Sequence, residues 1–362
     1  MWVRNAWYVA AWSDDVTNHA LLPRTIINEP LVLYRKSDGS VVALEDRCCH
    51  RLAPLSKGRL EHDDLRCMYH GMKFAADGRC VEIPGQAFIP QTAAVRSFPV
   101  VERGSWIWVW MGRAAMADSA LIPDTIAATD TGWHIKTGHL DYAAHYQLIN
   151  DNLLDLSHLS FVHAKTLGRN MPQWAAQRPR VTRLERGVRF QRWFENRPHA
   201  HYFGQPGEAY DLWHSYDFIV PGVFIQRPAW YPPGTAKRMD MQPPTEPPLF
   251  VRCDDQAVIA ETGRTSRYFY AVGARSSDAT VELADEMFRF TEMAFHEDKD
   301  IIEAQQKVID LDPERQMMSL SFDAGPNLFR GIVQQLVEAE TRDPQPMPGP
   351  APAMDLAAAQ GN

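Results

Sequence analysis

The sequence reads Cys48-Cys49-His50-Arg51 in one stretch and Cys67-Met68-Tyr69-His70-Gly71 in a second, with sixteen residues between His50 and Cys67. Each stretch offers one thiol and one imidazole as metal ligands. A plain interpretation is a pair of buried cysteines beside surface histidines, and another is a Cys₂His₂ zinc site. Zinc sites of that type usually pair cysteine with cysteine and histidine with histidine along the chain.

The alternating order of the two ligand types favours a two-iron cluster over a single zinc ion. In a Rieske [2Fe–2S] cluster one iron binds both cysteines and the other binds both histidines. We therefore expect Cys48, His50, Cys67 and His70 to hold such a cluster. Cys49, which lies between two of these residues, is interpreted as a spectator thiol.

The composition narrows the range of partners. The 362 residues carry a net charge of −8, which argues against nucleic acids and anionic membranes, because both are bound through basic surfaces. No apolar run approaches the roughly 20 residues that a membrane helix needs. The first residues lack the apolar core of a signal peptide, so a cytoplasmic location is expected. Five cysteines are too few and too scattered for a disulfide framework.

The distribution of apolar residues predicts an α+β chain in two domains and a tail. Residues 1–112 show short β-like runs between turn residues, which predicts an all-β domain. Residues 113–343 combine helix-like periodicity, near 145–162 and 281–308, with aromatic-rich strand candidates. We expect an antiparallel sheet flanked by helices there. Residues 344–362 are rich in Pro and Ala and are expected to be disordered.

A second group of possible ligands lies in the first helix-like segment. Asn152, Asp155 and His158 follow one another at three-residue steps, close to one helix face. A solvated polar face is the plain alternative. His163 lies about 140° further round an ideal helix than His158, so both can bind one ion only if the helix ends or distorts between them.

Two imidazoles need a carboxylate to complete a facial triad, which leaves iron(II) coordination sites open. Asp298 interrupts the apolar stripe of the 281–308 segment, and a buried carboxylate must be paired or metal-bound. Asp298 is therefore the expected third ligand, with an ordinary ion pair as the alternative. Glu297 and Asp300 fall off the stripe and are interpreted as solvated charges.

Taken together, the two groups of residues resemble the oxygenase (α) subunit of Rieske non-haem iron oxygenases over nearly the whole chain. Flanking residues are similar to the vanillate O-demethylase oxygenase components and dicamba monooxygenase. Those matches are Arg4-Asn5-Ala6-Trp7-Tyr8-Val9-Ala10, Asp151-Asn152-Leu153-Leu154-Asp155 and Pro313-Glu314-Arg315-Gln316.

The resemblance implies an aromatic monooxygenase that uses O₂ and externally supplied electrons, with oxidative O-demethylation of a methoxylated aromatic acid and release of formaldehyde as the expected reaction. The implied cofactors are a Rieske cluster and a mononuclear Fe²⁺ bound by His158, His163 and Asp298. Asn152 would lie beside the iron. Alternatives are a ring hydroxylase or dioxygenase, an N-demethylase, and a Rieske electron carrier without oxygenase activity.

Partners are also implied by the resemblance. The chain lacks a Gly-rich dinucleotide fingerprint, so NAD(P)H would act only through a separate flavin- or ferredoxin-type reductase. A homotrimer is expected, in which His70 of one subunit approaches Asp155 of the next and Asp155 bridges to His158.

Overall fold

The computed structural model describes residues 2–168, 174, 176–198 and 207–342, which fall into two compact units. The first unit comprises the residues up to Ile122 together with those from Val337 on, and the second runs from Pro123 to Leu336. The expected disordered tail, residues 344–362, lies outside the described residues. None of the helices in the described part is long and apolar enough to cross a membrane.

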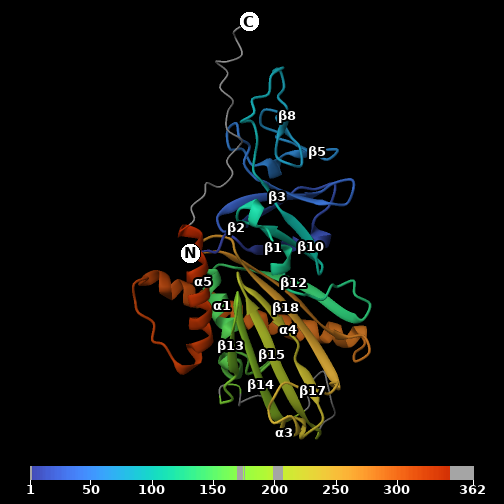
Figure 1. Cartoon of the computed structure of the whole chain (residues 1–362), viewed down its shortest axis with the longest axis vertical. Coiled ribbons are helices and arrows are strands. Elements are labelled where there is room, and N and C mark those ends of the chain that lie inside the picture. The colour runs from blue at the N-terminus through green and yellow to red at the C-terminus, as the bar shows by residue number, and fades with distance from the viewer. Residues whose placement is uncertain (1, 169–173, 175, 199–206, 343–362) are drawn as a thin grey trace. The chain divides into compact units, whose positions relative to one another are not determined.

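The first unit is built from three antiparallel sheets (Figure 1). Apolar residues fill one edge strand and the central strand of the first sheet, β1 and β11, and every residue of these two strands is buried. The strands, sheet by sheet in spatial order, are β1 (Trp7–Trp12), β11 (Trp106–Trp110) and β10 (Val100–Arg103); β2 (Leu22–Ile26), β3 (Glu29–Arg35), β4 (Val41–Glu45) and β9 (Ser97–Phe98); and β5 (Arg59–Glu61), β6 (Asp64–Arg66), β7 (Lys73–Phe74) and β8 (Cys80–Glu82).

The second unit contains one eight-stranded antiparallel sheet. Its strands in spatial order are β12 (Trp133–Tyr142), β19 (Ser266–Arg275), β18 (Phe250–Ala260), β16 (Val223–Gln226), β15 (Ala209–Ile219), β14 (Gly187–Pro198) and β13 (Arg180–Leu184), and β17 (Ala229–Tyr231) pairs with β15 and β18. All eleven residues of β18 are buried. This strand therefore lies in the middle of the core, with neighbours on both faces.

Helices cover this sheet. They are α1 (Tyr146–Leu154), α2 (Leu159–Val162), α3 (Thr235–Arg238), α4 (Val281–Leu311) and α5 (Ala324–Arg342), which continues into the first unit. The longest, α4, packs against β12 and β19 (Figure 1). The Thr280 side chain caps its first turn by accepting a hydrogen bond from the Leu283 amide at 3.3 Å. The predicted α+β fold, with an all-β first part and an antiparallel sheet flanked by helices, is confirmed.

The segment 145–162, expected to be helical, is interrupted. α1 ends at Leu154, Asp155 adopts an extended conformation, and a 3₁₀ turn over Leu156–His158 leads into α2. The Asp155 carboxylate accepts a hydrogen bond from the Ser157 amide at 2.9 Å, which favours a new helical start at this point. α2 ends at Val162, so the predicted helix end between His158 and His163 is present.

Candidate active site

Two loops of the first unit are built alike. In each, the amide of the fourth residue after the cysteine donates to the cysteine carbonyl, from Leu52 to Cys48 and from Gly71 to Cys67, at 2.9 Å in both. The cysteine amide in turn donates to the carbonyl of the fifth residue after it. These four bonds make two matching turns, which present one buried thiol each.

The histidines of these loops lie on the outside of the unit. His50 and His70 are exposed, and their ring centroids are 4.5 Å apart. Cys49 is also exposed, whereas Cys48 and Cys67 are buried. One edge of the expected cluster site is therefore enclosed by thiols, and the other edge, formed by the imidazoles, faces outward.

His158, His163 and Asp298 meet in the second unit. Their three ligand atoms lie within 4.8 Å of one another, and among the described residues no other group of His, Cys, Asp and Glu side chains does so. Asp298 Oδ1 is 3.5 Å from His158 Nε2 and 3.2 Å from His163 Nε2. His163 and Asp298 are buried. The interruption at Asp155 and the end of α2 turn both imidazoles toward α4.

In both imidazoles the proton is on Nδ1, and Nδ1 donates it to an acceptor other than Asp298. His158 Nδ1 donates to the backbone carbonyl of Asp155 at 2.6 Å, and His163 Nδ1 donates to the Glu297 carboxylate at 2.8 Å. Nε2 is thus the free ligand atom of each ring. Burial lowers the pKa of His158. For His163 burial acts in the same direction, but Asp298 and Glu297 outweigh it and raise the pKa.

Asn152 and Asp155 take different positions around this triad. The Asn152 amide donates to Asp298 Oδ1 at 2.9 Å and lies 3.4 Å from His158 Nε2, so α1 places it beside the ligand atoms. Asp155 contacts His158 through its backbone carbonyl, while its carboxylate caps the next turn. The expected bridge between Asp155 and His158 is therefore made by the main chain in this subunit.

Glu297 corrects a prediction from the sequence. The helical pattern predicts a solvated charge here, but Glu297 Oε2 accepts hydrogen bonds from His163 Nδ1 and from the Thr166 hydroxyl, the latter at 2.5 Å. Glu297 and Thr166 were missed because neither lies on the apolar stripe or within a ligand motif. Only the tertiary contact between α4 and the residues after α2 reveals them.

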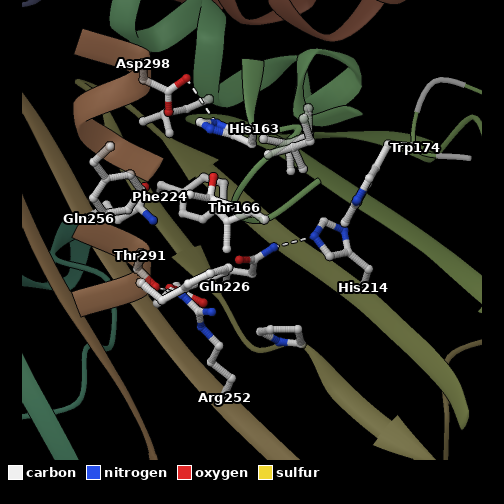
Figure 2. A pocket seen from close by; sticks show the side chains of 18 of the residues that line it. His163, Thr166, Trp174, His214, Phe224, Gln226, Arg252, Gln256, Thr291 and Asp298 are labelled. Atoms are coloured by element: carbon white, nitrogen blue, oxygen red, sulfur yellow. Dashed lines mark hydrogen bonds and ion pairs between the residues drawn. The ribbon is translucent and has the colours of Figure 1, made fainter. Parts of the chain in front are cut away.

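A cavity of about 540 Å³ opens beside the triad. Its aromatic lining includes Trp174, Phe224, Trp230, Phe290 and Phe295. Figure 2 shows His163 and Asp298 at one end, with polar side chains from the sheet reaching into the space below them. The volume suits a small aromatic molecule, and the aromatic walls favour one.

Polar side chains that line the cavity form hydrogen bonds with one another. Gln226 Nε2 lies 2.5 Å from His214 Nε2, and burial lowers the pKa of His214 well below 6.5, so this imidazole is neutral. The Arg252 guanidinium donates to Asp254 at 2.7 Å and to Thr291 at 2.8 Å. No local pattern in the sequence identifies these cavity residues.

Two family models match the chain in the same two regions. The Rieske [2Fe–2S] domain matches residues 6–99, and the vanillate O-demethylase oxygenase C-terminal domain matches residues 142–339. The chain belongs to the vanillate O-demethylase family of Rieske oxygenases.

Relatives within the family cover nearly the whole chain. A toluene-4-sulfonate monooxygenase system iron-sulfur subunit from Comamonas testosteroni is 39% identical over 94% of this chain and 98% of its own length. A vanillate O-demethylase oxygenase subunit from a Pseudomonas strain is 32% identical, over 94% and 96%. The crystal structure of dicamba monooxygenase bound to dicamba superposes with a TM-score of 0.80 at 29% identity, covering 94% of this chain and 99% of that one.

Membership of the family settles the class of protein. The chain is an iron oxygenase with a Rieske [2Fe–2S] domain and a mononuclear iron site, so the alternatives of a zinc module and of an electron carrier fall away. Its relatives are named as components of multi-component oxygenase systems.

The residues present fit both implied cofactors. Two imidazoles and one carboxylate with converging ligand atoms form the facial set that suits iron(II), and the adjoining cavity leaves room for further ligands. In the first unit, the thiol and imidazole pairs do not converge as a single-ion site among the described residues. That separation is expected for a cluster in which each pair binds its own iron.

Proposed function

We propose that this chain is the oxygenase component of a monooxygenase that oxidatively O-demethylates a methoxylated aromatic acid and releases formaldehyde. The observation that supports this most is the aromatic-walled cavity beside the His158–His163–Asp298 triad. Arg197 and Arg252 also line this cavity, and the charge of Arg252 is balanced by its ion pair with Asp254. Arg197 is therefore the side chain that we assign to binding the acid group of the substrate.

The two groups of possible ligands have different roles in this function. Residues 1–112 form the cluster domain, in which Cys48, His50, Cys67 and His70 bind the [2Fe–2S] cluster. Residues 113–343 form the catalytic domain, in which the triad binds Fe²⁺. When bound, the cluster supplies electrons and the ferrous ion supplies dioxygen activation.

The chain's own side chains orient the substrate and keep water out. The aromatic walls bind an apolar ring and exclude bulk solvent from the triad. Asn152 donates to the Asp298 oxygen and so fixes the direction in which that carboxylate faces the two imidazoles. The paired His214 and Gln226 present polar atoms that are already fixed in position, so little side-chain entropy is lost on binding.

A second candidate is hydroxylation of the methyl group of an arylsulfonate. It is favoured by the identity of 39% and 40%, over 94% of this chain, to two relatives named as toluene-4-sulfonate monooxygenase subunits. Both reactions attack a C–H bond of a methyl group on an aromatic acid. They differ in the atom that carries that methyl group, oxygen in one case and ring carbon in the other.

The function also needs contacts with other proteins, in a homotrimer and with an electron donor. Leu52, Met68 and Tyr69 are exposed around His50 and His70, and an exposed apolar rim of this kind favours contact with another protein. A homotrimer in which His70 approaches Asp155 of the neighbouring subunit would cover it. A separate reductase that oxidises NAD(P)H would supply the electrons.

The test combines the purified chain, a reductase and NADH with methoxylated benzoates and methylated benzenesulfonates. O₂ uptake coupled to formaldehyde supports O-demethylation, whereas a hydroxymethyl product supports the second candidate. A cis-diol product would refute both. The molar mass in solution tests the trimer separately.

A further inference from the structure

The two histidines of the triad are held in unequal ways. His158 Nδ1 donates to a neutral backbone carbonyl three residues away, while His163 Nδ1 donates to the carboxylate of Glu297, 134 residues away. Hydrogen bonds to an ionised acceptor are roughly twice as strong as neutral ones. The position of His163 therefore depends more on a charged partner than that of His158 does.

One helix contacts both nitrogens of the His163 ring. Glu297 and Asp298 are consecutive on α4, and they face Nδ1 at 2.8 Å and Nε2 at 3.2 Å respectively. Because the ring is buried and Nδ1 donates to Glu297, the ring cannot rotate without losing that hydrogen bond. The pair also carries two negative charges, which balance a divalent cation.

Thr166 fixes Glu297 in this position. The hydroxyl donates to the same Oε2 that accepts from His163, at 2.5 Å. A half-exposed glutamate would otherwise sample several rotamers, and ordering it costs entropy. Two hydrogen bonds to one oxygen offset that cost, which argues that the arrangement is specific and is not an incidental surface contact.

We propose that Glu297, held by Thr166, is a positioning residue that orients His163 and raises the affinity of the triad for a divalent metal ion. This inference rests on the proposed role of the triad as the iron site. Removing a partner of this kind typically weakens metal binding about 10–100-fold. If only the negative charge of Glu297 is removed, the site with a divalent ion bound should carry a net positive charge.

The experiment uses the full chain with its cluster intact and oxidised, after a chelator has removed the mononuclear iron. Calorimetric titration with Co²⁺ gives the affinity, and EPR of bound Co²⁺ gives the site's symmetry. Glu297→Ala is expected to weaken Co²⁺ binding about 10–100-fold. Glu297→Gln keeps an oxygen that can accept from Nδ1, so its Co²⁺ affinity should fall less than that of Glu297→Ala. Thr166→Val should also cause an intermediate loss of Co²⁺ affinity.

Azide binding to the Co²⁺-loaded protein distinguishes the loss of the Glu297 charge from a structural loosening of the site. Glu297→Gln should bind azide several-fold more tightly than the unchanged protein, because one negative charge beside the metal is gone. A merely structural defect would weaken both metal and azide.

Asp300 is an exposed carboxylate on the same helix, and Asp300→Asn is the matched control. It should change neither the Co²⁺ affinity nor the azide affinity. Unchanged Co²⁺ affinity in both Glu297 variants overturns the inference. Failure of the unchanged protein to bind Co²⁺ at this site would instead count against the proposed function.

Discussion

Leu52 and Gly71 occupy equivalent positions in the two cluster loops, four residues after Cys48 and Cys67, and both have positive φ, 57° and 78°. Each amide closes its turn on the cysteine carbonyl. The same left-handed conformation is thus required twice, once with glycine and once with a residue that adopts it only at a cost.

Gly71→Ala is expected to destabilise the first unit more than Leu52→Gly does. A Cβ at Gly71 would lie 2.7 Å from Pro84 Cγ, and the left-handed conformation adds about 1–2 kcal/mol for a residue with a Cβ. Leu52→Gly should stay within about 1 kcal/mol, because relief of strain offsets the extra freedom of glycine. Thermal unfolding followed by the colour of the cluster measures both, and equal effects would contradict the prediction.

Asp298→Ala should remove the mononuclear iron and leave the cluster in place. Iron content is expected to fall from about three to about two atoms per chain, with loss of substrate-coupled O₂ uptake and an unchanged cluster spectrum. Asp300→Ala, on the exposed side of α4, serves as the control. Full iron content and activity in Asp298→Ala would exclude the carboxylate as a ligand.

Arg252 and Asp254 form a buried ion pair in the wall of the cavity. Arg252→Met leaves the carboxylate unpaired and should lower the free energy of unfolding by about 3–5 kcal/mol. The double variant Arg252→Met/Asp254→Leu replaces both charges with apolar groups and should recover most of that loss. Urea unfolding of the two variants provides the comparison, and additive losses would argue against a coupled pair.

His214 should make the protein less stable as the pH falls. Burial, aided by the nearby Arg192 charge, lowers the pKa of His214 well below 6.5 in the folded state. Below pH 6.5 the unfolded chain gains a proton that the folded chain does not bind, so stability falls by at most about 1.4 kcal/mol per pH unit. His214→Gln removes this contribution.

Urea unfolding at pH 7.5, 6.5 and 5.5 tests this effect. The difference in stability between the two proteins should shift in favour of the Gln variant as the pH falls. A difference that is constant with pH would show that His214 also takes up its proton in the folded state.

Local patterns in the sequence predicted much of the fold and the candidate site. The spacing of Cys48, His50, Cys67 and His70 indicated one centre, and the acid within the stripe of α4 indicated the partner of His158 and His163, which the structure brings together. A ligand motif and a helical period are both local features, which is why the sequence alone could suggest these residues.

The rest depends on tertiary contacts. Glu297 lies one residue off the stripe, and nothing in the sequence shows that it faces Thr166. The cavity residues on β18 could not be chosen because all of its residues are buried, so no alternation distinguishes the two faces of the strand. Asp155 contacts His158 through its backbone carbonyl, a contact that the side-chain pattern does not predict.

The two centres are assembled over very different lengths of chain. Both Cys–His loops lie within one short segment, whereas Asn152 and Asp298, which share a hydrogen bond, are 146 residues apart. Loosening of α4 would therefore release the lone ferrous ion while the protein kept its colour. The ratio of total iron to visible absorbance thus gauges, in any preparation, what fraction of molecules retains a closed catalytic core.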